Sequence, residues 1–172
     1  MIDLHTLTVA HTAISIVALV LGFVVLFKLI GAQTRPTLET WFIVLAVLTS
    51  ATGYLFPFEK LLPSHIVGGI ALLVLAGTIV ARYVKQLAGG WRTVYGIGLV
   101  ISVWLDAFVF VAQAFAKVPA LKEIAPTPNA PAFGIAQTVV LLIFVALGIA
   151  TVKGLRRLAG GSPVAGLSPK AS

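Results

Sequence analysis

Long apolar runs are the feature that most limits what this chain can fold into. Crossing the roughly 30 Å hydrocarbon core of a bilayer takes about 20 mostly apolar residues, because each helical residue adds about 1.5 Å. Five segments of the sequence qualify, at residues 7–30, 41–58, 65–84, 94–116 and 133–152. A backbone inside lipid has no water to bond, so each segment is predicted to be a transmembrane helix.

Composition supports lipid as the main solvent. Charged residues make up 10% of the 172 residues and hydrophobic residues 59%, whereas a soluble domain has about 25% charged residues. We therefore expect an all-α integral membrane bundle of five spans over residues 1–157, followed by a disordered cytoplasmic tail at 158–172. The first span lacks a basic flank and is too long for a signal-peptide core, so it is expected to stay as an anchor.

The basic residues predict the orientation. With the amino terminus outside, nine Lys and Arg residues fall on the inner side and three on the outer side. The inner nine are Lys28, Arg35, Arg82, Lys85, Arg92, Lys153, Arg156, Arg157 and Lys170. Cytoplasmic loops collect positive charge, so this count favours an outer amino terminus and a cytoplasmic carboxyl terminus.

The net charge of +7 therefore reflects topology. No basic patch with interleaved aromatic residues is present, so nucleic acid is not an expected partner. The expected partners are the lipid bilayer and, as a candidate, another membrane protein.

The connections between spans carry further expectations. Prolines 119, 126, 128 and 131 crowd the longest outer loop, so residues 117–132 are expected to be extended and irregular. The second span is short and has Pro57 near its end, and Pro63 follows in the tight connection to the third span. If these two spans formed a re-entrant pair, the charge count would be unchanged. Trp41, Trp91, Tyr83 and Tyr95 lie near span ends, as in an aromatic belt. Gly96 and Gly98 are expected to let helices pack closely.

Asp106 is the most conspicuous polar residue, because it lies near the middle of the fourth span. Ser102 and Gln113 share roughly one helical face with it. One interpretation is a carboxyl that carries a proton or contacts a cation, and a small-solute or proton pathway through Asp106 could include Gln113 and Gln137. The other is a structural Asp that bonds Ser or Thr across a helix interface.

A second group of polar residues shares one depth. His11, His65, Gln113 and Gln137 all lie toward the outer side of their spans, so they could line a polar pocket. His11 and His65 could hold a b-type haem between them or bind a quinone. His5, His11 and His65 could hold a metal ion, and a purely structural role for the histidines is the plain alternative.

Standard catalytic motifs are missing from the sequence, and the absence of cysteine excludes disulfides and thiolate metal sites. This favours a non-enzymatic helper, sensor or structural subunit. The alternatives are a haem- or quinone-binding electron-transfer protein that uses His11 and His65, and a small-solute or proton pathway through Asp106.

Three stretches resemble a family of small proteobacterial multi-pass inner-membrane proteins without an assigned biochemical role. They read HTAISIVALVLGF near the amino terminus, FPFEKLLPSHIVGG from Phe56, and VFVAQAFAKVPALKEIAPTPNAPAF ending at Phe133. The resemblance implies the same topology and a location in a bacterial inner membrane, and it transfers no catalytic residue. The chain departs from this family at Asp106, where the family prefers an amide, and near Ala130, where it prefers an acid. The first departure argues against a proton relay at Asp106.

Overall fold

The computed structural model describes residues 3–56 and 63–160, and this part of the chain contains helices and no strand. Five helical segments are long and apolar enough to cross a membrane: Leu4–Ile30, Pro36–Leu55, His65–Val84, Trp91–Lys117 and Pro131–Gly160. They correspond to the five segments expected from the sequence, so the five-helix, all-α architecture is confirmed.

The helix bounds extend four of the expected segments, whereas the second helical segment begins earlier, at Pro36, and ends at Leu55. The elements are α1 (Leu4–Ile30), α2 (Pro36–Thr52) with the 3-10 turn η1 (Gly53–Leu55), α3 (Pro63–Ile79) with the π-helical turn η2 (Val80–Val84), α4 (Trp91–Lys117), α5 (Pro119–Ile124) and α6 (Pro131–Gly160). Four of the helices begin at a proline, where the missing N–H is not needed and the fixed φ suits the first turn.

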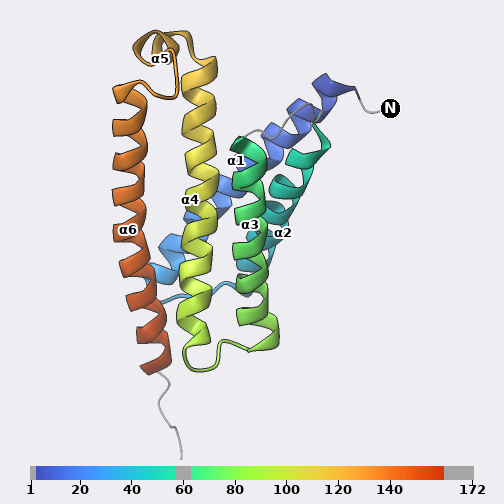
Figure 1. Ribbon diagram of the computed structural model, residues 1–172. Coiled ribbons are helices and arrows are strands. Elements are labelled where there is room, and N and C mark those ends of the chain that lie inside the picture. The colour runs from blue at the N-terminus through green and yellow to red at the C-terminus, as the bar shows by residue number, and fades with distance from the viewer. Residues whose placement is uncertain (1–2, 57–62, 161–172) are drawn as a thin grey trace, which may run out of the picture.

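The long helices form a closed circuit. Helix α1 packs against α2, α2 against α3, and α3 against α4. Helix α4 then packs against α6, and α6 packs against α1. Helix α4 also contacts α1 across the bundle, so it lies at the centre of the packing (Figure 1). The loop between α3 and α4 and the carboxyl end of α6 lie at one end of the bundle, and α5 lies at the other.

Two glycines allow helices to approach closely. A Cβ atom at Gly154 of α6 would lie 2.0 Å from the backbone oxygen of Leu29 in α1. A Cβ atom at Gly98 of α4 would lie 2.1 Å from Oγ1 of Thr78 in α3. The packing role expected of Gly98 is confirmed, and Gly154 adds a contact of the same kind between α1 and α6.

The buried core is concentrated at the end of the bundle that carries the α3–α4 loop, called here the inner end. The buried residues of α1, α4 and α6 lie between Ala18 and Leu29, Tyr95 and Ala107, and Phe144 and Leu155. The other halves of these helices, at 4–17, 108–117 and 131–143, contain no buried residue. The helices are therefore held together mainly at the inner end.

Two expectations about loops are wrong. Residues Pro119–Ile124 form the short helix α5, because Pro119 occupies the tolerated first position and good helix formers follow before the next proline. Helix α6 runs beyond Val152 to Gly160, so residues 158–160 are helical, with Leu158 packed against the core. The rest of the expected tail, 161–172, and the connection at 57–62 lie outside the described residues.

Candidate functional site: a polar face on α4

A single stripe of polar residues follows α4 from the inner end outward. Tyr95, Ser102, Asp106 and Gln113 lie on this helix at successive spacings of seven, four and seven residues. With about 3.6 residues per turn, such spacings return to nearly the same side of the helix. Helix α4 therefore has one polar face and one apolar face. The four residues of the polar stripe differ in what they contact.

At the inner end, Tyr95 belongs to a buried charged cluster. The Tyr95 hydroxyl donates to Oε2 of Glu39 at 2.6 Å, and Nη1 of Arg82 donates to the Tyr95 oxygen at 2.6 Å. Arg82 also forms a salt bridge with the same Glu39 oxygen. Glu39 is 2% exposed and Tyr95 is fully buried, so the charges are shielded from solvent and depend on one another.

Three helix ends place this cluster. Glu39 lies in the first turns of α2, where its Oε1 accepts the backbone N–H of Arg35 at 2.8 Å. Arg82 lies in the π-helical turn at the end of α3, and such turns are frequent at functional sites. Tyr95 lies in the second turn of α4. The cluster thus joins α2, α3 and α4 at the inner end.

This cluster was not predicted from the sequence. Tyr95 was expected in an aromatic belt, and that expectation is wrong because its hydroxyl is bonded inside the bundle. Tyr83 and Trp41 do lie on the surface, at 49% and 57% exposure. A useful signal was present: Glu39 is an isolated acid at the start of one span, and Arg82 is a base at the matching end of the next.

Asp106 lies further along the stripe. Its Oδ2 atom is buried and has no hydrogen-bond partner among the described residues. Ser102, one turn away, donates instead to the Gly98 carbonyl on its own helix at 2.8 Å. The interpretation of Asp106 as a residue bonded to Ser or Thr across an interface therefore finds no support at Oδ2.

The outer polar residues differ in what they contact. Gln113 is exposed, whereas Gln137 of α6 donates from Nε2 to the Phe108 carbonyl of α4 at 3.0 Å. The Oε1 atom of Gln137 is buried and has no partner in the described part of the chain. Gln113 and Gln137 thus occupy different surroundings although they lie at a similar depth.

His11 and His65 both pack near the outer end of α2. Nδ1 of His11 lies 2.9 Å from Oγ1 of Thr52, and its ring meets Phe56 edge-on at 5.3 Å. The ring of His65 lies 5.7 Å from that of Tyr54. These contacts are typical of histidines that stabilise the packing of helix ends. The haem or quinone role of His11 and His65 stays a prediction.

The metal alternative receives no support from the geometry. Within residues 3–56 and 63–160, no three His, Asp or Glu side chains gather closely enough to hold a metal ion. The site expected from His5, His11 and His65 is therefore not formed.

Comparisons with known protein families, with curated proteins and with solved structures found no match to this chain. The resemblance to small proteobacterial membrane proteins therefore stays a prediction. What the geometry itself establishes is a five-helix bundle with a charged cluster at its inner end and an unpartnered carboxyl oxygen midway along α4.

Proposed function

We propose that this chain is a five-span, non-enzymatic protein of a bacterial inner membrane, with its amino terminus outside. In this proposal, Asp106 takes up a proton or a small hydrogen-bonding solute from the outer side. The observation that carries the proposal is the buried, unpartnered Oδ2 of Asp106. Leaving a polar group buried without a partner costs about 1–3 kcal/mol, and ionisable residues inside membranes usually serve a function.

The two ends of the stripe support access from the outer side. Toward the inner end, the buried cluster of Glu39, Arg82 and Tyr95 fills the space between α2, α3 and α4. Toward the outer end, Gln113 on the same face is exposed, and residues 108–117 of α4 contain no buried residue. If Asp106 is reached from the outer side alone, a sensor or binding protein fits better than an open channel.

Infrared spectroscopy of the protein in sealed vesicles tests this proposal. We expect a carbonyl band of a protonated carboxyl that is absent in Asp106→Asn and present in the matched control Asp3→Asn. A rapid pH change on the outer side should alter this band, whereas the same change on the inner side should not. A band that ignores the outer pH, or follows the inner pH equally, would refute proton uptake from the outer side.

The Asp106→Asn variant also separates the two kinds of ligand. An amide can still donate and accept hydrogen bonds but cannot release a proton. Solute binding should therefore survive in this variant, while proton uptake should be lost. The family that the sequence resembles prefers an amide at this position, which favours solute binding over proton uptake.

A helper or subunit role is a second candidate, supported by the exposed outer half of the bundle. Phe110 of α4 and Ile135 of α6 are 52% and 65% exposed there. A larger membrane protein that co-purifies with the wild-type chain but not with Phe110→Ser would support this role. For the haem alternative, the test is an α-band in the reduced-minus-oxidised spectrum that is lost in His11→Ala or His65→Ala.

A further inference from the structure

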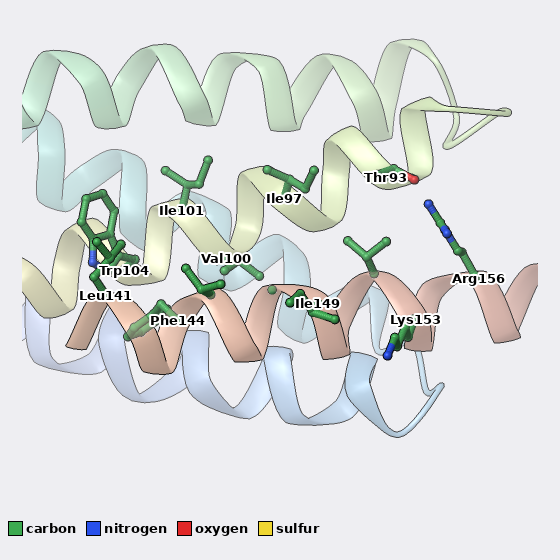
Figure 2. A pocket seen from close by; sticks show the side chains of 13 residues that line it. Thr93, Ile97, Val100, Ile101, Trp104, Leu141, Phe144, Ile149, Lys153 and Arg156 are labelled. Carbon is green, nitrogen blue, oxygen red and sulfur yellow. The ribbon is translucent and has the colours of Figure 1, made fainter. Parts of the chain in front are cut away.

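A groove between α4 and α6 has a lining that changes from cationic to apolar along its length. Its volume is about 580 Å³. Apolar walls come from residues such as Ile97, Ile101, Phe144 and Ile149, and Trp104 lies at one end. At the other end, Figure 2 shows Arg156 extending from α6 toward Thr93 of α4, with Lys153 one turn earlier on α6.

The groove has the length of one membrane leaflet. Thr93 and Trp104 are eleven residues apart on α4, which corresponds to about 16 Å at 1.5 Å per residue. Half of a hydrocarbon core of roughly 30 Å is about 15 Å. With Thr93 at the inner boundary, Trp104 would lie near the bilayer midplane. An acyl chain entering from the inner leaflet would therefore match the apolar part of the groove.

The cationic end has no acidic partner within the described chain. Among the described acids, Asp3 and Glu123 lie at the outer end, and Asp106 lies midway along α4. Glu39 is already paired with Arg82. Lys153 and Arg156 are both exposed, so their positive charge is available to an anion from outside these residues, at the level of the lipid headgroups.

We propose that the α4–α6 groove binds an anionic diacyl phospholipid of the inner leaflet, with its phosphate near Lys153 and Arg156 and an acyl chain lying toward Trp104. Basic sites between transmembrane helices on the cytoplasmic side recognise anionic headgroups in this way. The occupant is a phospholipid because the same groove combines two cations with an apolar wall of leaflet depth. Free phosphate would leave that apolar wall uncovered.

Fluorescence quenching of Trp104 tests the proposal. The variant Trp41→Phe/Trp91→Phe leaves Trp104 as the single tryptophan of the chain. It is reconstituted into phosphatidylcholine nanodiscs that contain increasing fractions of acyl-brominated phosphatidylglycerol, or of phosphatidylcholine brominated in the same way. We expect half-maximal quenching at a several-fold lower fraction of the phosphatidylglycerol. Equal quenching by the two lipids would overturn the proposal.

Charge variants identify the headgroup site. Each cation near a membrane surface contributes about fivefold to the binding of an anionic lipid, so Lys153→Gln and Arg156→Gln should each reduce the preference by that factor. The matched control is Arg157→Gln, because Arg157 is an exposed neighbour on α6 that does not line the groove. An equal loss in Arg157→Gln would show diffuse surface attraction and refute a defined site.

A shape variant tests the acyl part independently of charge. Gly148 lines the groove, so Gly148→Leu should fill it and weaken quenching by brominated phosphatidylglycerol while both cations stay in place. Gly77→Leu is the control, because nothing lies within 4 Å of a Cβ atom at Gly77. Native mass spectrometry of the wild-type chain, with both lipids carrying identical acyl chains, gives a measurement that needs no substitution. Equal retention of the two lipids there would also refute the proposal.

Discussion

Replacing Gly154 by alanine tests how the bundle is held together at its inner end. The added Cβ atom would lie 2.0 Å from the Leu29 oxygen, 2.9 Å from the Leu29 carbonyl carbon and 3.0 Å from the Ile30 Cα atom. All three are backbone atoms, so no side-chain rotation can relieve the clash. To reach an ordinary contact of 3.4 Å, α6 would have to withdraw from α1 by about 1.4 Å.

The withdrawal of α6 from α1 determines how much free energy of unfolding is lost. Leu29 and Leu155 are 0% and 2% exposed, and a gap of about 1 Å already removes roughly half of a dispersion contact. Overpacking costs about 1–3 kcal/mol, whereas alanine in place of glycine returns up to about 1 kcal/mol in a helix interior. We therefore expect Gly154→Ala to lower the free energy of unfolding by about 2 kcal/mol.

Unfolding by SDS in mixed micelles, followed by circular dichroism, measures this change. Gly77→Ala is the matched control, because a Cβ atom there meets nothing within 4 Å, and it should be neutral or slightly stabilising. If Gly154→Ala proved as stable as Gly77→Ala, the close approach of α1 and α6 and the reasoning built on it would be wrong.

Three further predictions use the same chain. Tyr95→Phe should cost about 1.5–3 kcal/mol of unfolding free energy by removing a donor to the buried Glu39 carboxylate, and Glu39→Gln should cost about 3 kcal/mol by leaving Arg82 unpaired. If the double variant lost the sum of the two single losses in the same SDS titration, the idea of a shared network would be contradicted. Gly98→Ala should destabilise by about 1–3 kcal/mol through contact with Thr78, and Thr78→Ala should rescue most of that loss in a double-mutant cycle. Because the chain has no cysteine, a single Thr127→Cys should react with an impermeant maleimide from outside intact cells and Gln86→Cys only after permeabilisation; the reverse pattern would invert the proposed orientation.

The five helices could be predicted from the sequence because the signal for each one is local. Lipid thickness demands a certain run of apolar residues, and the backbone must satisfy its own hydrogen bonds within that run. The spacing of Ser102, Asp106 and Gln113 likewise placed them on one face of α4, since it depends only on the helical repeat. Helix α5 was not predicted because prolines usually break helices, although Pro119 begins this one.

Tertiary structure decided everything that depends on which helices are neighbours. The hydroxyl of Tyr95 reaches Glu39 across 56 positions of sequence, and no local pattern specifies that meeting. The same holds for Gly154 against Leu29, and for the groove in which Arg156 and Trp104 lie at opposite ends. Apolar helices are nearly interchangeable to the lipid, so their order and rotation come from packing and from a few buried polar contacts, which act between segments and not within them.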